Sequence, residues 1–194
     1  MEEIEAKFLG IDTETIEKRL QELGAIFEKE RLMYAISFDF PGFPLDANSA
    51  WVRLRNEGDV IKIAFKQRLG VKADGGNDDG MREIETEAGH FEDMRQILLA
   101  IGMVEKFVME KKRRSWVKDG IRYDIDFWPR LDPYLEIETD SWDRLEEAAR
   151  ELGLKPEEKK IFSASQIYKM AGINDTDYVQ MTFAEWVPRD PSAS

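Results

Sequence analysis

The chain begins MEEIEAKF (residues 1–8), and Glu3, Glu5 and Lys7 stand there at every second position, with apolar or small residues between them. Successive side chains of a β-strand point to opposite faces, so this spacing predicts a strand over residues 2–9. One face of that strand carries two carboxylates and an ammonium group, and the other face packs on an apolar core. The first question is what a strand gains from such a charged face.

The same alternation of charged and apolar residues recurs on later segments, and the sign of the charge sorts largely by segment. An ordinary antiparallel sheet would leave this charged face in water. A closed antiparallel barrel with the face turned inward would instead gather the bases and acids around one lumen. The alternating positions are Arg53 and Arg55; Lys62 and Lys66; Glu83, Glu85 and Glu87; Lys111 and Arg113; Arg122, Asp124 and Asp126; and Glu136 and Glu138.

Helical patterns separate the strands and predict an α+β fold. Asp12 and Ser141 are good helix N-caps, and glycines follow the apolar stripes. The predicted helical segments are 13–23, 91–102, 141–153 and 156–172. The predicted strand segments are 2–9, 25–40, 51–68 with a turn at 57–59, 81–88, 104–128 with a turn at 118–120, and 133–140.

Two stretches lack such periodicity. Residues 70–80, GVKADGGNDDG, are rich in Gly and Asp and predict an exposed, mobile loop between two strands. Residues 173–194 are polar and predict a tail that frays or docks on the surface. We therefore expect one domain over residues 2–172, followed by the tail.

Composition excludes several kinds of protein. A net charge of −12 argues against nucleic-acid and anionic membrane partners, and no apolar run approaches the roughly 20 residues of a membrane span. The chain has no cysteine and one histidine, so thiolate and histidine-rich metal sites are excluded. His90 precedes a helical pattern and is expected at the helix start rather than in catalysis. A cytoplasmic location is expected.

The remaining chemistry is that of oxygen ligands and fixed cations. Arginine binds phosphate oxygens in bidentate fashion, and clustered carboxylates bind hard ions such as Mg²⁺ or Mn²⁺. A barrel lumen lined by both therefore suits a polyphosphate and its metal ions. In-line attack on a phosphoryl group needs charge neutralisation and a positioned water or hydroxyl group, which Glu5 or Glu138 would hold.

These motifs, in this order, resemble the CYTH superfamily, also called triphosphate tunnel metalloenzymes. The resemblance runs from residue 2 to about residue 170. The motifs that carry it are Glu3-x-Glu5-x-Lys7, Arg53-Leu54-Arg55, the AFK segment ending in Lys66, Arg82-Glu83-Ile84-Glu85, KKRRSW at 111–116, YDID at 123–126 and YLEIE at 134–138.

The resemblance implies an eight-stranded antiparallel β-barrel with helices packed outside, which binds a triphosphate compound and Mg²⁺ or Mn²⁺. It assigns phosphate contacts to the basic positions and metal binding to the acidic ones. The implied phosphate-binding residues are Lys7, Arg53, Arg55, Lys66, Arg113 and Lys160 or its neighbour Lys159. The implied metal ligands are Glu3, Glu5, Asp124, Glu136 and Glu138, and Glu83, Glu85 and Arg122 match a more variable part of the pattern.

The expected activity is metal-dependent hydrolysis of inorganic tripolyphosphate, thiamine triphosphate or a nucleoside triphosphate. Glu5, Lys7, Arg53, Arg55 and Glu138 are the expected catalytic residues. One alternative is a class IV adenylate cyclase, although only Met1 and Glu2 precede the ExExK motif, where some cyclases of the family carry a His-Phe pair. Another is a non-catalytic polyphosphate-binding module. The expected assembly is a monomer or homodimer.

Overall fold

The computed structural model describes residues 4–70 and 80–190. The chain divides into two compact units, each with an apolar core of its own. The first unit comprises Met1–Arg31 and Lys111–Asp175, and the second comprises Leu32–Glu110 and Thr176–Ser194. The long strands β2 (Ile26–Asp39) and β6 (Val104–Lys118) each contribute residues to both units.

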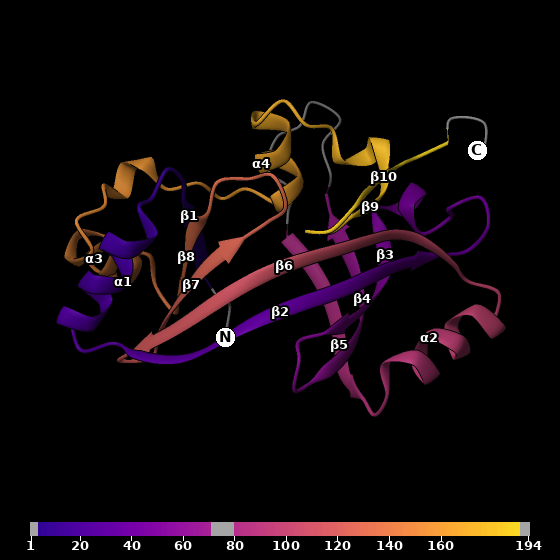
Figure 1. Ribbon diagram of the computed structural model, residues 1–194, viewed down its shortest axis with the longest axis horizontal. Coiled ribbons are helices and arrows are strands. Elements are labelled where there is room, and N and C mark those ends of the chain that lie inside the picture. The colour runs from indigo at the N-terminus through magenta and orange to yellow at the C-terminus, as the bar shows by residue number, and fades with distance from the viewer. Residues whose placement is uncertain (1–3, 71–79, 191–194) are drawn as a thin grey trace. The chain divides into compact units, whose positions relative to one another are not determined.

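The first unit combines antiparallel strands with helices (Figure 1). Strand β8 pairs with both β1 and β7, and β7 forms a hairpin with β6. Asp119 and Gly120 turn that hairpin with positive φ angles of 49° and 76°, as the sequence predicted for residues 118–120. The elements are β1 (Ile4–Phe8), α1 (Thr13–Glu22), β7 (Ile121–Phe127), β8 (Tyr134–Thr139), α3 (Trp142–Glu151), the 3₁₀ turn Pro156–Glu158 and α4 (Ala164–Met170).

Helices α1 and α3 cover one face of these strands (Figure 1). Ile16 and Leu20 of α1 and Leu145 of α3 pack in one cluster with Ile125 and Ile137 of the strands. All five side chains are at most 3% exposed. The apolar half of the alternating pattern therefore faces the helices, and the charged half lies on the other face of the same strands.

The helix ends follow from their capping residues. The Asp12 carboxylate accepts a hydrogen bond from the Thr15 backbone N–H at 2.8 Å, and Ser141 caps α3 in the same way. His90 caps α2 (Phe91–Ala100), as expected. Among the described residues, no helix is long and apolar enough to cross a membrane.

The predicted helix over 156–172 is too long. Helix α4 begins only at Ala164, where Ser163 and Gln166 form a capping box. Upstream of it, Lys160 pairs with Lys7 of β1 through two backbone hydrogen bonds of 2.8 Å. That pairing holds the segment extended, so the helix cannot extend back to Pro156.

The second unit packs helix α2 against a meander of strands (Figure 1). Strand β3 pairs with β2 and β4, and β4 pairs with β5, all antiparallel. Leu54 of β3, Ile36 of β2 and Leu98 of α2 are buried in its core. The elements are the 3₁₀ turn Asp46–Asn48, β3 (Ala50–Asn56), β4 (Ile61–Leu69), β5 (Gly80–Ala88), α2, the 3₁₀ turn Asp175–Asp177, β9 (Tyr178–Met181) and β10 (Trp186–Pro188).

The tail docks through two short strands. Strand β9 pairs in parallel with β6, with Val108 opposite Gln180, and β10 pairs with β9. The Arg189 guanidinium donates hydrogen bonds to the backbone oxygens of Lys106, Tyr178 and Thr176. The tail is thus anchored to the sheet by both backbone and side-chain bonds. The single domain predicted over 2–172 stays a prediction.

The strands follow the order β1-β8-β7-β6-β2-β3-β4-β5, with β9 and β10 off this path. The pairs specified along this path are antiparallel. The α+β class and the antiparallel sheet are therefore confirmed. Closure into an eight-stranded barrel stays a prediction, and the loop predicted at 70–80 lies, for residues 71–79, outside the described part of the chain.

Candidate active site

Both units carry a charged face opposite their apolar core. On β1, Ala6 and Phe8 are buried in the core, whereas Glu5 and Lys7 alternate with them. On β3, Leu54 is buried in the core and Arg53 and Arg55 alternate with it. The strand period thus separates apolar from ionic chemistry residue by residue.

In the first unit these charges form what we call the acidic cluster. The strand register places Glu5 opposite Glu138, Lys7 opposite Glu136, and Glu136 opposite Asp124. Burial is deep, because Lys7, Asp124, Asp126 and Glu136 are exposed by 8%, 2%, 1% and 6%. A solvated strand face would not bury its charges to this extent. The cluster comprises Glu5, Lys7, Lys111, Arg113, Asp124, Asp126, Glu136 and Glu138.

Arg113 is the centre of the acidic cluster. Its guanidinium donates to Asp126 at 2.5 and 2.7 Å, to Asp124 at 2.6 Å and to Glu136 at 3.0 Å. Three carboxylates around one cation hold the pKa of Arg113 well above its usual value, despite the opposing effect of burial. The charge of Arg113 is therefore fixed.

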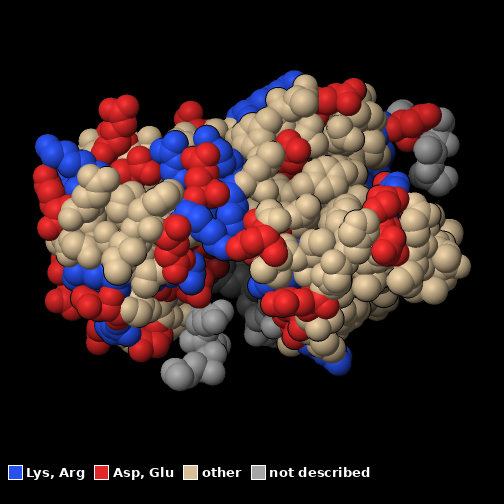
Figure 2. Space-filling view, turned by 60° about the horizontal axis from the view of Figure 1, so that its bottom comes forward, with Lys and Arg blue, Asp and Glu red and all other residues tan. Residues whose placement is uncertain are grey.

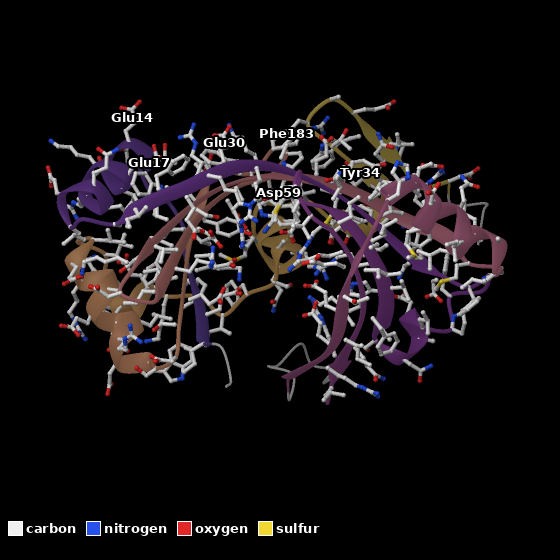
Figure 3. All side chains as sticks on the ribbon, turned by 90° about the horizontal axis from the view of Figure 1, so that it is seen from below. Glu14, Glu17, Glu30, Tyr34, Asp59 and Phe183 are labelled. Atoms are coloured by element: carbon white, nitrogen blue, oxygen red, sulfur yellow. The ribbon has the colours of Figure 1, made fainter. Side chains whose placement is uncertain are left out.

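The next residue, Arg114, lies on the opposite face of β6. Its guanidinium binds Glu30 of β2 at 2.6 Å and Glu17 of α1 at 3.1 Å, and Figure 3 labels both acids. Of the two adjacent arginines in KKRRSW, only Arg113 joins the acidic cluster, as the sequence analysis expected.

Lysines complete the acidic cluster from two sides. The Lys7 ammonium group contacts Glu5 and lies 3.2 Å from Glu136. Lys111 binds Asp126 at 2.8 Å and lies 5.3 Å from the centre of the Trp128 ring. Lys160 reaches this neighbourhood through its backbone bridge to Lys7. Lys159 instead binds Glu146 of α3 at 2.8 Å.

The carboxylates of the acidic cluster differ in proton affinity. Burial alone would raise the pKa of Asp126, yet Lys111 and Arg113 lower it to about 2. Burial raises the pKa of Asp124, although Arg113 opposes this. Desolvation and the Glu136 charge raise the pKa of Glu5, against the effect of Lys7. An added cation would oppose the effect of burial at Glu5 and Asp124.

The second unit carries the basic cluster, made of Arg53, Arg55, Lys62 and Lys66 with Glu57, Glu83 and Glu85. Lys62 lies 2.8 Å from Glu85, and Lys66 lies 2.9 Å from Glu83. Arg53 approaches Glu83 and Glu85 only to 3.5 Å, and Arg55 approaches Glu85 to the same distance and Glu57 to 2.5 Å. Bases outnumber acids here.

Two observations reflect this surplus of cations: pKa values of basic side chains are lowered, and some arginine N–H groups lack a hydrogen-bond acceptor. Burial and the neighbouring Arg55 lower the pKa of Arg53, and burial and Arg53 lower the pKa of Lys66. The buried Nε atoms of Arg53 and Arg55 have no hydrogen-bond acceptor. Ala64 stands opposite Arg53 in the register and is too small to cover it. The basic cluster can therefore accept further anionic oxygens.

The donor set fits a hard divalent cation, although the described residues hold no ready-made group of three His, Cys, Asp or Glu ligands. The acids of the first unit are engaged by Lys7, Lys111 and Arg113. One buried oxygen, Oδ1 of Asp124, nevertheless has no hydrogen-bond donor. An unpartnered carboxylate oxygen among other carboxylates is the feature expected beside an oxygen-preferring ion.

The predicted site residues fall into these two clusters with three exceptions. Glu3 lies outside the described residues. Arg122 stands opposite Glu138 in the register but binds Glu28 at 2.9 Å. Lys160 contacts the acidic cluster through its backbone, by the bridge to Lys7. The sequence analysis placed Lys62, Lys111 and Asp126 on the charged face without assigning them to the site, and it did not name Glu57 as a site residue, although Glu57 stands two residues after Arg55.

The face displayed in Figure 2 carries no broad patch of one sign that would mark either cluster. Acidic and basic side chains are interspersed at the left of that view, and most of its right side is formed by other residues. The clusters are thus defined by strand register and burial rather than by a broad patch of one sign.

Comparison with known proteins gives one family and several related folds. The family model of the CYTH domain matches residues 1–170. No curated protein matches the chain. A Pyrococcus horikoshii protein, PH1012, is similar in structure, with a TM-score of 0.65 and 22% identity over 86% of this chain and 99% of that one.

Two further structures carry activity names. A candidate adenylate cyclase from Vibrio parahaemolyticus has a TM-score of 0.67 and 17% identity, covering 86% of this chain and 97% of its own. A candidate adenylyl cyclase from Hippeastrum, described as having a dominant triphosphatase activity, has a TM-score of 0.61 and 16% identity, covering 88% and 95%. At these identities the likeness shows a common fold.

Proposed function

The chain belongs to the CYTH family, and from this premise we propose that it hydrolyses the terminal phosphate of a triphosphate compound with the help of a divalent metal ion. The substrate class is inorganic tripolyphosphate, thiamine triphosphate or a nucleoside triphosphate. The observation that carries the proposal is the pair of ionic clusters opposite the apolar cores, one rich in buried carboxylates and one with a surplus of cations.

In this proposal the basic cluster binds the phosphate chain. Arg53 and Arg55 each have a buried Nε without an acceptor, which supports direct bonds to phosphate oxygens. Lys66 adds a point charge, and Lys7, Arg113 and Lys160 supply cations in the first unit. Glu83 and Glu85 hold the basic side chains in place until phosphate oxygens replace them.

The residues that would hold the metal ion are Glu5, Asp124, Glu136 and Glu138, with Glu3 as a further ligand. A bound Mg²⁺ or Mn²⁺ would neutralise phosphate charge and polarise the bond that breaks. The raised pKa values of Glu5 and Asp124 support this assignment, because a nearby cation relieves the cost of keeping both ionised.

The protein's own groups then arrange an in-line displacement. Glu5 or Glu138 accepts a hydrogen bond from the attacking water and sets its direction. Arginine and lysine side chains neutralise the charge that spreads over the transferred phosphoryl oxygens. Arg113, fixed by three carboxylates, keeps its charge throughout. We also propose that the sheet closes into the barrel implied by the resemblance and that the protein acts in the cytoplasm as a monomer or homodimer.

Adenylate cyclase is the second candidate. Its chemistry uses the same phosphate and metal groups, but the 3′-hydroxyl of ATP attacks the α-phosphate and pyrophosphate leaves. The names of the Vibrio and Hippeastrum proteins favour considering it. The dominant triphosphatase activity of the Hippeastrum protein supports placing hydrolysis first.

The test is to incubate the pure protein with Mg²⁺ or Mn²⁺ and, separately, tripolyphosphate, thiamine triphosphate and ATP, and to identify products by mass spectrometry. Release of orthophosphate, lost in Glu5→Gln and kept in the surface control Glu14→Gln, is the expected result. Cyclic AMP with pyrophosphate would replace the proposal by the cyclase. Binding of a triphosphate without turnover would leave only a binding module.

A further inference from the structure

Ser115 is a buried hydroxyl at the border of the acidic cluster that the proposed reaction does not use. It lies two residues after Arg113 on β6, so both side chains share the charged face. In the hairpin register it stands directly opposite Asp124. The residue is fully buried, with 0% of its surface exposed. A buried hydroxyl must find hydrogen-bond partners, and its partners indicate what it does.

Arg31 of β2 fixes the direction of this hydroxyl. The Arg31 Nη2 atom donates to the Ser115 Oγ atom at 3.2 Å. Arginine cannot accept a hydrogen bond, so Oγ acts as the acceptor in this contact and its own proton remains available. Ser115 faces Asp124 across the strand pair, so the Asp124 carboxylate is the acceptor placed to take that proton, and the Ser115 hydroxyl lowers the pKa of Asp124 against the larger, raising effect of burial. Arg31 thus leaves the Ser115 proton for the carboxylate that stands opposite it in the register.

Asp124 is held unevenly. Its Oδ2 atom accepts from Arg113 Nη1 at 2.6 Å, whereas Oδ1 has no donor although the residue is only 2% exposed. A buried carboxylate that served only as a structural counter-ion would be expected to satisfy both oxygens. Arg113 thus holds Asp124 through Oδ2 and leaves Oδ1 without a donor, and Ser115 lies opposite the same side chain.

We propose that Ser115, oriented by Arg31, is a positioning residue that fixes the Asp124 carboxylate so that Oδ1 is presented to a divalent cation. This inference rests on the metal-binding part of the proposed function. Groups that orient metal-ligating side chains typically contribute 10- to 100-fold to metal affinity or activity. Neither Ser115 nor Arg31 contacts the phosphate chain in this proposal, so their loss should leave triphosphate affinity at saturating metal unchanged.

The test measures Mn²⁺ binding directly, by the electron paramagnetic resonance signal of free Mn²⁺ in titrations of the full-length protein. The variants are Ser115→Ala, Ser115→Thr, Asp124→Asn and Arg31→Met. The matched control is Ser165→Ala, because Ser165 also donates to an aspartate of the first unit, Asp175 at 2.9 Å, away from the acidic cluster. Circular dichroism reports whether each variant folds.

We expect Ser115→Ala and Arg31→Met to weaken Mn²⁺ binding by roughly 10- to 100-fold, Ser115→Thr to restore most of it, and Ser165→Ala to match the wild type. Wild-type affinity in Ser115→Ala would overturn the positioning role and leave the proposed function standing. If Ser115→Ala does not fold, Arg31→Met decides by the same criterion. Absence of Mn²⁺ binding by the wild type would overturn both the inference and the metal-dependent mechanism.

Discussion

The acidic cluster of the first unit and the basic cluster of the second are built on the same alternating strand pattern, but acids outnumber bases in the first and bases outnumber acids in the second. In the first, Arg113 binds three carboxylates at 2.5 to 3.0 Å, and these three acids, Asp124, Asp126 and Glu136, are almost fully buried. In the second, Arg53 reaches its glutamates only at 3.5 Å, and the side chains of Glu83 and Glu85 remain 35% and 24% exposed.

The difference indicates a division of labour. Short, buried bonds with several partners hold the carboxylates of the acidic cluster in place before any ligand arrives, which suits a metal site. The contacts of Arg53 and Arg55 with the partly exposed Glu83 and Glu85 are long, at 3.5 Å, and are easily exchanged, which suits a site where phosphate oxygens must replace them. The first cluster is organised in advance, and the second is open to substitution.

The largest expected effect is on stability. Arg113→Met leaves three buried carboxylates without their shared cation, and breaking such a buried group costs about 3–5 kcal/mol of unfolding free energy. Arg53→Met should cost less than about 1 kcal/mol, because Lys62 and Lys66 still pair with its glutamates. Urea denaturation of both variants measures the comparison. Equal losses would contradict the contrast between the clusters.

The next effect is on substrate affinity. Arg53→Ala or Arg55→Ala removes a charge-assisted hydrogen bond worth about 1.5–3 kcal/mol, so KM should rise roughly 10- to 150-fold with the fold intact. Arg114→Ala is the control, because Arg114 binds Glu17 and Glu30 on the other face of β6. Steady-state kinetics with each triphosphate gives the answer. Unchanged KM values in both variants would remove the basic cluster from the site.

The acidic cluster also predicts a pH dependence. The folded-state pKa of Asp126 is about 2, below its ordinary value of 3.8, so its contribution to stability is complete above that ordinary value and is lost as the pH falls toward the folded value. The contribution amounts to about 2 kcal/mol. The difference in unfolding free energy between wild type and Asp126→Asn should therefore shrink by that amount on going from neutral to strongly acidic pH. A difference independent of pH would refute the ionic role of Asp126.

The smallest effect is expected at Arg122. This residue forms an ordinary surface ion pair and so shows how such a pair differs from the contacts within the two clusters. Its side chain is 38% exposed and pairs with Glu28 at 2.9 Å. Exposed pairs of this kind contribute less than about 1 kcal/mol. Arg122→Ala should leave both unfolding free energy and KM nearly unchanged. A large rise in KM would instead support the assignment of Arg122 to the phosphate site.

The sequence predicted those features of the fold that depend on the two-residue period of strands and on the capping of helices. Alternation at Glu5 and Lys7 or at Arg53 and Arg55 fixes which side chains share a face, and Asp12 and Ser141 fix where helices begin. It placed Asp126 on the charged face but assigned only Asp124 to the site, because the two have the same spacing and only the fold shows that Arg113 binds both. Lys111 was likewise placed on that face without a site role, because only the fold shows its bond to Asp126.

The sequence pattern could not predict pairing between segments that lie far apart in the chain. Residues 156–172 have helix-forming composition, yet the backbone bridge from Lys160 to Lys7 joins positions 153 residues apart and keeps this part extended. The parallel pairing of β9 with β6 likewise depends on where the tail meets the sheet. Local propensity cannot foresee such contacts, because tertiary pairing overrides it.

The measurement that tests the division of labour most directly is the Mg²⁺ dependence of tripolyphosphate hydrolysis by wild type, Glu5→Gln and Arg53→Ala. Glu5→Gln should need more Mg²⁺ and recover only part of its activity at high Mg²⁺, because a neutral amide is a poor ligand. Arg53→Ala should keep the wild-type Mg²⁺ midpoint and show a raised KM. Full activity of Glu5→Gln at limiting Mg²⁺, or the same shift in both variants, would contradict the account.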